Sequence, residues 1–450
     1  MFGTNGIRGI ANVDLTPQLV LKMSQAVGTF FNGGRMLIGR DGRTSGKMVS
    51  LILQSGLMST GCLVHDAGLA PTPCIQYTIR SRNYDGGVVV TASHNPPQYN
   101  GLKVIDRDGI EVSRENERKI EEIFFKDKLA LRDWNKLGRV EAIGDILSPY
   151  RKAVETHIET EPIRERAIQV VVDAGNGVGA LVTPQLLREM GCEVQTINSD
   201  VDGMFPGRPP EPTPDNLKGL SRVVQATGAD LGIAHDGDAD RVIFVAENGE
   251  VQWGDRTFAL LAKRFLMRHR GETIVTPVSS SQVIRDIADS QGGKVVWTRV
   301  GSIDVSRKMQ EIGAKLGGEE NGGVFYGPHV PVRDGAMTAA MMVEALALTG
   351  EKLSRLIGEL PHYYNIKARI PCPDNMKSRV LSDITQRSSN MTVETIDGLK
   401  VWLDEHTWIL IRPSGTEPIF RMFVEASLES EAEKLLSEYT AILQSLIKGE

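Results

Sequence analysis

One unit recurs along this chain: a short apolar run rich in Val and Ile, then a glycine-rich polar loop, then a segment with helical spacing of apolar residues. The apolar runs lie at 35–39, 87–90, 169–172, 231–234, 273–275 and 408–411. Such alternation is typical of mostly parallel sheets covered by helices on both faces. Ligands bind these sheets beyond the carboxyl ends of the strands. We therefore expect the chemistry of this chain to lie in its glycine-rich loops.

Length and composition limit the class of protein. At about 150 residues per domain, 450 residues correspond to roughly three domains. The 41% hydrophobic and 24% charged residues are typical of a folded globular chain and exclude disordered, collagen-like and coiled-coil proteins. A net charge of −6 has the wrong sign for non-specific nucleic-acid binding. We expect small polar partners and no nucleic acid.

Changes in local pattern predict four units, at 1–150, 151–254, 255–362 and 363–450. A charged helix begins near Arg114, and Ser148-Pro149-Tyr150 precedes another helix, so the first boundary is placed at 150. The proline-rich stretch 205–214 cannot continue a helix or a central strand, and it is interpreted as an ordered loop, with a linker as the alternative. A new strand is expected at 366–371.

The cysteines and the N-terminal residues indicate in which cellular compartment the protein is expected. The four cysteines lie too far apart for a paired metal site or a disulfide framework, so they are expected to be core residues in a reducing environment. The N-terminal residues lack the basic and apolar regions of a signal peptide, and no run approaches 18 apolar residues. We expect a cytoplasmic protein with no membrane segment.

Three carboxylates at alternate positions follow the apolar run 231–234. In a turning loop, Asp236, Asp238 and Asp240 can converge on one hard cation such as Mg²⁺. A calcium-binding EF-hand loop needs glycine at its sixth position, where this chain has Arg241, and the residues after it have a strand pattern instead of a helix pattern. A divalent-cation site at the end of a strand is favoured over a solvated acidic turn. We call residues 236–241 the acidic loop.

The apolar run 87–90 leads into a hydroxyl-bearing loop, residues 91–96, which we call the serine loop. Ser93 is a candidate nucleophile at the end of a buried strand, where amides of the following turn can hold an anion. The alternative is that Ser93 only caps the next turn. His94 is a candidate base or a simple turn residue.

Two more loops carry polar groups suited to a phosphosugar. Residues 412–418, the arginine loop, combine one guanidinium, two hydroxyls and a flexible amide, which suits a phosphate dianion; the residues are Arg412, Ser414, Gly415 and Thr416, with Arg421 as a second cation. A β-turn with an incidental arginine is the alternative.

Residues 317–323, the glycine loop, present Glu319 and Asn321 among glycines, which suits sugar hydroxyls. A plain glycine-rich hairpin is nearly as consistent with that pattern. The 175–179 stretch lacks the spacing of a dinucleotide-binding loop, which disfavours a dinucleotide cofactor.

These four loops, in this order, resemble those of the α-D-phosphohexomutase family over nearly the whole chain. The resemblance implies that Ser93 carries phosphate and completes, with the three aspartates, the shell of one Mg²⁺. It implies that Glu319 and Asn321 contact the sugar and that Arg412, Ser414, Gly415 and Thr416 hold the unreacting phosphate. Residues matching the lining of the transfer site are Arg8, His94, Lys103 and Arg241.

The resemblance also implies a fold and an activity. The fold is α/β, with three related mixed α/β domains and a smaller α+β C-terminal domain around a central cleft. The activity is that of an isomerase, an intramolecular phosphotransferase that moves phosphate between carbons 6 and 1 of a hexose phosphate through a phosphoserine and a hexose 1,6-bisphosphate. Either Lys103 or His94 moves the hydroxyl proton. The partner is a hexose phosphate, and the chain is a monomer or a homodimer.

The chain departs from the family pattern at two places. Many members have a histidine where Gly323 stands, and members that handle glucose or mannose often carry another in the stretch corresponding to 298–302. The pair Val300-Gly301 and the run Gly317-Gly318-Glu319 resemble the phosphoglucosamine mutase branch, although that branch commonly has Ser where Asn321 stands. The resemblance therefore favours that branch slightly over the archaeal-type phosphomannomutase/phosphoglucomutase branch. A phosphatase and a non-catalytic sugar-phosphate binder are the alternatives from other classes.

Overall fold

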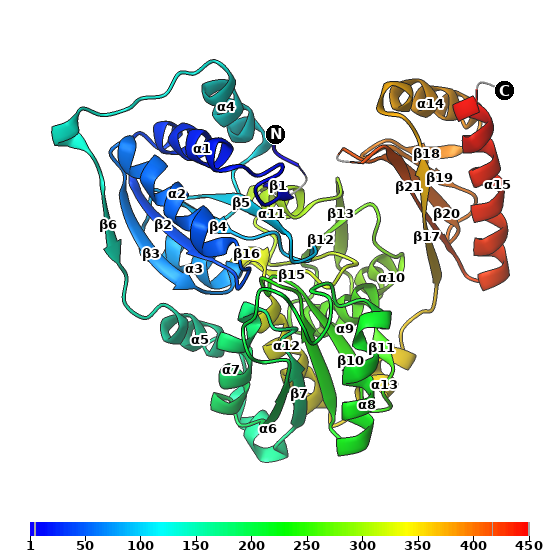
Figure 1. The fold of residues 1–450 in the computed structure, drawn as a ribbon. Helices are drawn as coiled ribbons and strands as arrows, with labels where there is room; N and C mark the ends of the chain where they lie inside the picture. Colours follow the sequence, from blue (N-terminus) through cyan, green and yellow to red (C-terminus); the bar gives the residue numbers. More distant parts are fainter. Residues whose placement is uncertain (4–5, 416, 449–450) are drawn as a thin grey trace.

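The computed structural model describes residues 1–3, 6–415 and 417–448 (Figure 1). The described residues form four sheets, each built from its own stretch of chain. Three are mixed sheets flanked by helices, and the fourth is antiparallel. This is the four-domain α/β architecture that the sequence predicted. No helix in the described part of the chain is long and apolar enough to cross a membrane.

The first sheet has the strand order β1-β5-β4-β2-β3-β6. Its strands are β1 (Ile7–Ile10), β2 (Arg35–Arg40), β3 (Leu63–Leu69), β4 (Gly86–Val90), β5 (Tyr99–Asp106) and β6 (Arg139–Ala142). Its helices are α1 (Pro17–Phe30), α2 (Gly46–Ser59), α3 (Thr72–Ser81) and α4 (Arg114–Phe125), with a short turn of helix η1 (Trp134–Lys136).

The second sheet has the order β11-β10-β9-β7-β8. Its strands are β7 (Gln169–Asp173), β8 (Glu193–Ile197), β9 (Leu231–His235), β10 (Val242–Ala246) and β11 (Val251–Gln252). Its helices are α5 (Leu147–Glu155), α6 (Thr160–Arg166), η2 (Val178–Leu181), α7 (Thr183–Glu189), η3 (Pro214–Leu217) and α8 (Lys218–Thr227).

The third sheet has the order β13-β12-β14-β15-β16. Its strands are β12 (Thr273–Pro277), β13 (Lys294–Thr298), β14 (Leu316–Gly318), β15 (Val324–Tyr326) and β16 (Val330–Arg333). Its helices are α9 (Gly254–Arg268), α10 (Val283–Ser290), α11 (Ser302–Ile312), α12 (Gly335–Thr349) and α13 (Leu353–Gly358).

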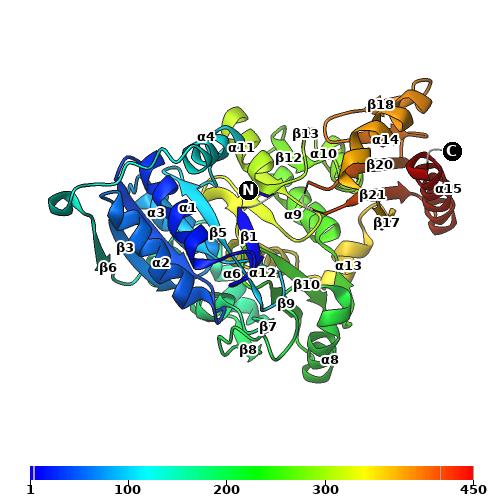
Figure 2. The same cartoon turned by 45° about the horizontal axis from the view of Figure 1, so that its top comes forward.

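The fourth sheet, β17-β21-β20-β19-β18, is antiparallel throughout. Its strands are β17 (Tyr364–Pro371), β18 (Thr392–Glu394), β19 (Leu399–Trp402), β20 (Trp408–Pro413) and β21 (Ile419–Ala426), and its helices are α14 (Asp374–Arg387) and α15 (Glu429–Lys448). This domain has its own core and stands beside the third domain (Figures 1 and 2). The seam between them is apolar and includes Val278, Trp408 and Phe423.

The expectation of mostly parallel sheets is correct for only part of each mixed sheet. Strands β4, β2, β3 and β6 run parallel, but β4 pairs antiparallel with β5, β9 with β10 and β14 with β15. In all three antiparallel pairs the connection is one of the loops singled out above, and it is too short for the crossover that a parallel pair requires. The serine, acidic and glycine loops are therefore hairpin connections.

The structure also refines the helix boundaries. The helix expected after Ser148-Pro149-Tyr150 begins earlier, at Leu147, because the carboxylate of Asp145 accepts hydrogen bonds from the amides of Leu147 and Ser148. Pro149 then lies in the first turn, where its missing N–H costs nothing. Position 150 is thus inside α5, 254 is the first residue of α9, and 362 lies between α13 and β17.

Candidate active site

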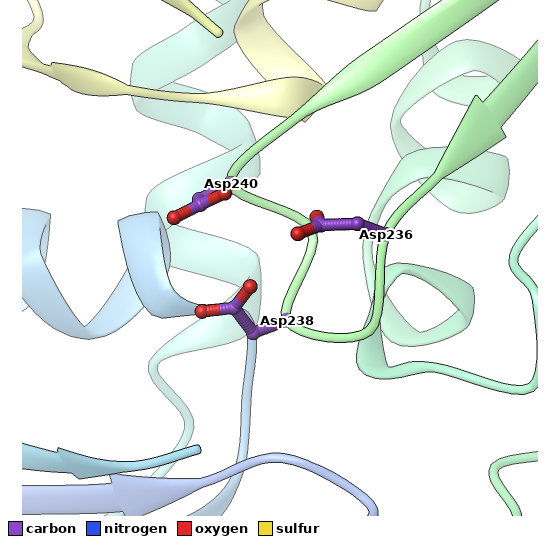
Figure 3. Close-up of side chains that lie close together, drawn as sticks. All are labelled: Asp236, Asp238 and Asp240. Atoms are coloured by element: carbon purple, nitrogen blue, oxygen red, sulfur yellow. The ribbon is translucent and has the colours of Figure 1, made fainter. Parts of the chain in front are cut away.

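The acidic loop connects β9 to β10 and buries all three of its carboxylates. One oxygen from each of Asp236, Asp238 and Asp240 lies within 4.8 Å of the others, and the side chains converge (Figure 3). Among the described residues, the Oδ1 atoms of Asp238 and Asp240 have no hydrogen-bond partner. Buried acceptors without donors are costly, and oxygen ligands suit a hard cation. The residues present therefore fit a divalent ion such as Mg²⁺.

The serine loop follows β4 and meets the acidic loop. The Oγ of Ser93 donates a hydrogen bond to Oδ2 of Asp236 at 2.7 Å, and the residue is buried in the left-handed region at φ 52°. A Cβ on Gly237 would lie 2.5 Å from the carbonyl oxygen of Ser93, so only glycine permits this approach of the two loops. His94 Nδ1 is 3.3 Å from Ser93 Oγ.

An arginine that the sequence analysis missed holds the serine loop in place. Arg43 is buried, pairs with Asp41 at 3.1 Å, and donates to the carbonyl oxygens of Ser93 at 2.7 Å and Asn95 at 2.5 Å. It also donates to two further carbonyls, those of Pro96 and Tyr99. Arg43 lies in the glycine-rich loop after β2, which was the available signal, but no spacing rule connects it to a loop fifty positions away.

The predicted cations surround the carboxylates. Lys103 on β5 donates to Asp238 at 2.7 Å and to Asp240 at 2.9 Å. Arg241 donates to Asp236 at 3.2 Å, and Arg8 on β1 donates to the side chain of Asn95 in the serine loop at 2.9 Å. The structure thus brings together every residue predicted for the transfer site.

The electrostatics of this site differ from residue to residue. Burial, with the neighbouring charge of Asp240, raises the pKa of Asp236 to about 7. Burial opposes ionisation of Asp240 as well, but the charges of Arg333 and Lys103 outweigh it and hold that pKa well below its ordinary value. Burial and the charges of Arg241 and Arg8 hold the pKa of His94 well below its usual range, so the imidazole is neutral at neutral pH.

The glycine loop reaches the same site through a second arginine that the sequence analysis missed. Glu319 is buried and accepts a hydrogen bond from Arg333 Nη1 at 3.3 Å, while Arg333 Nη2 donates to Asp240 at 2.6 Å. Burial raises the pKa of Glu319. Asn321 instead accepts from the amide of Gly323 within its own loop. Arg333 ends an apolar strand and precedes Asp-Gly, a signal similar to that of the other loops.

The arginine loop lies in the fourth domain, between β20 and β21. Arg412 pairs with Asp397 at 2.9 Å, Arg421 pairs with Glu417 at 2.8 Å, and the carbonyl of buried Ser414 accepts from Lys377 at 2.6 Å. Gly415 is exposed, and Thr416 lies outside the described residues. Figures 1 and 2 place this domain beside the third domain and away from β2 and β3. Asp397, the partner of Arg412, also accepts a hydrogen bond from the amide of Val300, so this end of the loop lies close to the third domain.

Three mixed α/β domains that bring a serine hydroxyl against a buried acidic loop, with a fourth domain carrying an arginine loop, define a phosphoryl-transfer enzyme of the phosphohexomutase class. The comparisons agree. The alpha/beta/alpha domains I, II and III of phosphoglucomutase/phosphomannomutase match residues 1–130, 148–249 and 253–364, and its C-terminal domain matches 368–442. The chain belongs to the phosphoglucomutase/phosphomannomutase family and is an intramolecular phosphotransferase.

Relatives of two kinds match over nearly the full length. A phosphoglucomutase/phosphomannomutase of Thermococcus kodakarensis is 44% identical over 100% of this chain and 99% of its own. A phosphoglucosamine/phosphogalactosamine mutase of Sulfurisphaera tokodaii is also 44% identical, over 99% of each chain. Among solved structures, a phosphoglucomutase/phosphomannomutase family protein of Burkholderia thailandensis superposes with a TM-score of 0.88 at 28% identity, covering 99% of this chain and 97% of its own.

Proposed function

We propose that this enzyme moves phosphate between carbons 6 and 1 of a hexose phosphate with Ser93 as the phosphate carrier. The observation that carries the proposal is the contact of the Ser93 hydroxyl with Asp236, beside two buried carboxylate oxygens without donors. A hexose 1,6-bisphosphate is the intermediate that joins the two half-reactions. We propose that the chain is divided into four domains, at residues 1–150, 151–254, 255–362 and 363–450.

The acidic loop is proposed to hold one Mg²⁺, with Asp236, Asp238, Asp240 and a phosphate oxygen on Ser93 as ligands. The ion, when bound, neutralises charge on the transferring phosphoryl group. Lys103 donates to Asp238 and Asp240, and the charges of these two carboxylates raise the pKa of Lys103 against the opposing effect of burial. Arg241 pairs with Asp236 at 3.2 Å and is close enough to assist the transferring group.

In the first half-reaction a substrate hydroxyl oxygen forms a bond to phosphorus while the bond from phosphorus to Ser93 Oγ breaks. The hydroxyl proton leaves the sugar, and Ser93 Oγ gains a proton. The neutral imidazole of His94 lies beside Ser93 Oγ and is placed to accept the sugar hydroxyl proton and pass it to Ser93 Oγ. Lys103 stays protonated between the carboxylates, where its charge can stabilise the transferring group. The second half-reaction is the reverse, with the other phosphate of the bisphosphate returning to Ser93.

The sugar and the second phosphate are proposed to lie between the third and fourth domains. Glu319 and Asn321 would accept hydrogen bonds from sugar hydroxyls. The phosphate that does not react would bind the arginine loop, through Arg412, Ser414, Gly415, Thr416 and Arg421. Each of the two arginines pairs with a carboxylate, Arg412 with Asp397 and Arg421 with Glu417, which orients its guanidinium.

The preferred substrate is proposed to be glucosamine 6-phosphate, with mannose and glucose phosphates as the alternative. Several relatives at 37–44% identity are called phosphoglucosamine mutases, and one at 44% is called phosphoglucomutase/phosphomannomutase. The four cysteines are free and buried, which supports work in the reducing cytoplasm. The arginine loop, as a second phosphate site, favours a mutase over a phosphatase that admits water.

The test is to compare the parent with Ser93→Ala. Intact-mass measurement of the purified parent should find one phosphate that Ser93→Ala lacks. The variant should lose interconversion of hexose 6- and 1-phosphates; turnover at the parent rate would exclude Ser93 as the carrier. Release of inorganic phosphate in place of isomerisation would support a phosphatase, and binding without turnover would support a non-catalytic sugar-phosphate binder. Values of kcat/KM on glucosamine, glucose and mannose phosphates then assign the substrate.

A further inference from the structure

Gly323, the last residue of the glycine loop, packs directly against Arg333. A Cβ at position 323 would lie 2.4 Å from Cδ and 2.9 Å from Cγ of Arg333. The backbone at 323 does not itself require glycine, because its φ is outside the left-handed region. The side chain of Arg333 therefore occupies the space that any larger residue at 323 would need.

From that position, the guanidinium of Arg333 contacts two loops of different domains. Nη2 donates to Asp240 in the acidic loop at 2.6 Å, and Nη1 donates to Glu319 in the glycine loop at 3.3 Å. All three side chains are buried, with 6% or less of each exposed. A planar guanidinium has its donors in fixed directions, so it sets the orientation of both carboxylates at once.

We propose that Arg333 is a positioning residue that fixes Glu319 relative to the acidic loop, and that glycine at 323 is what admits it. The inference rests on the proposed function, in which Glu319 contacts a sugar hydroxyl. With Oε2 held by Arg333, Glu319 presents its other oxygen in one direction. With Oδ2 of Asp240 held by Arg333 and Lys103, Oδ1 stays available for a cation. The sugar-contacting carboxylate is thus kept in register with the site of phosphoryl transfer.

The test is a double-mutant cycle of Arg333→Ala and Glu319→Gln. Both are made in a Ser93→Ala background, and the dissociation constant of glucosamine 1-phosphate is measured calorimetrically with Mg²⁺ present. Glu319→Gln alone should weaken binding about tenfold, as expected for the loss of a charge-assisted hydrogen bond. After Arg333→Ala, the same change should cost less than about twofold, because Glu319 is no longer oriented. An equal loss in both backgrounds would overturn the proposal.

Gly323→Ala tests the same proposal while Arg333 itself is retained. The new methyl group should displace the guanidinium and weaken glucosamine 1-phosphate about as much as Arg333→Ala does, and it should add nothing to Arg333→Ala. If Gly323→Ala leaves the dissociation constant of the Ser93→Ala protein unchanged, the proposed role of the glycine is wrong. Arg355→Ala, at a largely exposed arginine on α13, is the matched control and should bind as the Ser93→Ala protein does.

A negative result for the role of Arg333 can be distinguished from a negative result for the proposed function. The cycle measures sugar-phosphate binding in protein that cannot turn over, so it gives a result whether or not Ser93 carries phosphate. Absence of isomerisation by the unmodified protein would exclude the proposed function. Additive losses of binding in the cycle would exclude only the role of Arg333. A Ser93→Ala protein that binds glucose or mannose 1-phosphate but not glucosamine 1-phosphate would assign the alternative substrate, and the same cycle then tests Arg333 with that ligand.

Discussion

Arg43 donates to the main-chain carbonyl of Ser93 at 2.7 Å, from a loop fifty residues earlier in the chain. The second domain repeats this relationship: Arg208 donates to the carbonyl of His235, the residue before Asp236, at 2.6 Å. Each arginine also pairs with an aspartate at the end of the neighbouring strand, Asp41 in the first domain and Asp173 in the second. Two buried ion pairs thus fix the two loops whose contact forms the site.

Replacing Arg43 with Met should therefore disable the serine loop. The change leaves the Asp41 carboxylate and several loop carbonyls buried without donors, so unfolding in urea should show a loss of about 3–5 kcal/mol. Intact mass should show Ser93 largely unphosphorylated, because the left-handed backbone at Ser93 loses its main support. Arg107→Met, at an exposed position, is the control and should stay within about 0.5 kcal/mol. A similar small change for Arg43→Met would contradict the account.

Phosphorylation of Ser93 should tighten cation binding. It replaces a hydroxyl that donates to Asp236 with a group carrying about −1.5 to −2 charges. The added oxygens are ligands, and the added charge repels Asp236 unless a cation lies between them. Titration with Mn²⁺ should give a dissociation constant at least about tenfold lower for phosphorylated than for dephosphorylated protein. The Ser93→Ala variant should match the dephosphorylated parent, and equal affinities in both phosphorylation states would exclude the phosphate as a ligand.

Cation binding should also depend on pH through Asp236. Burial raises the pKa of Asp236 to about 7 from an ordinary 3.8, so between about pH 4 and 7 the folded chain holds a proton that the unfolded chain has released. This group therefore lowers the free energy of unfolding as pH rises through that window. A cation must displace the same proton, so Mg²⁺ should bind the dephosphorylated protein about tenfold more weakly at pH 6 than at pH 8.

Thermal unfolding with and without Mg²⁺ measures this effect, because bound ion stabilises the folded state. Asp255 provides a matched control: burial raises its pKa to about 7 as well, but it lies at the start of α9, outside the acidic loop. Asp255→Asn should keep the pH dependence of the Mg²⁺ shift. Loss of this pH dependence in Asp255→Asn would mean that the displaced proton belongs to Asp255 and not to Asp236.

The sequence predicted those residues of the site that belong to short, recognisable motifs. Runs of Val and Ile ended in loops whose residue types made Ser93 and Asp236 candidates, and the structure places Ser93 Oγ 2.7 Å from Asp236 Oδ2. The prediction of mostly parallel strands was wrong for the pairs β4–β5, β9–β10 and β14–β15, because the loop after each first strand leads directly into an antiparallel neighbour instead of a helix. The sequence-based prediction missed Arg43 and Arg333 because their position at a strand end shows no more than that each lies near a loop, and does not indicate which distant groups it contacts. Their partners are up to 56 and 93 positions away, so only the packed fold reveals their role.

The last prediction concerns the arginine loop. Asp397 pairs with Arg412 at 2.9 Å and accepts from the amide of Val300 in the third domain at 3.1 Å, so it both orients the arginine and ties the loop to the seam between the two domains. Asp397→Asn keeps an acceptor for Val300 but removes the charge. Steady-state kinetics should show KM for the hexose phosphate raised about five- to tenfold with kcat changed less than about threefold, because the phosphate held by this loop does not react. Asp404→Asn, in an exposed turn of the same domain, should leave both constants unchanged. A lower KM in Asp397→Asn would mean that Asp397 competes with the substrate phosphate for Arg412 instead of presenting it.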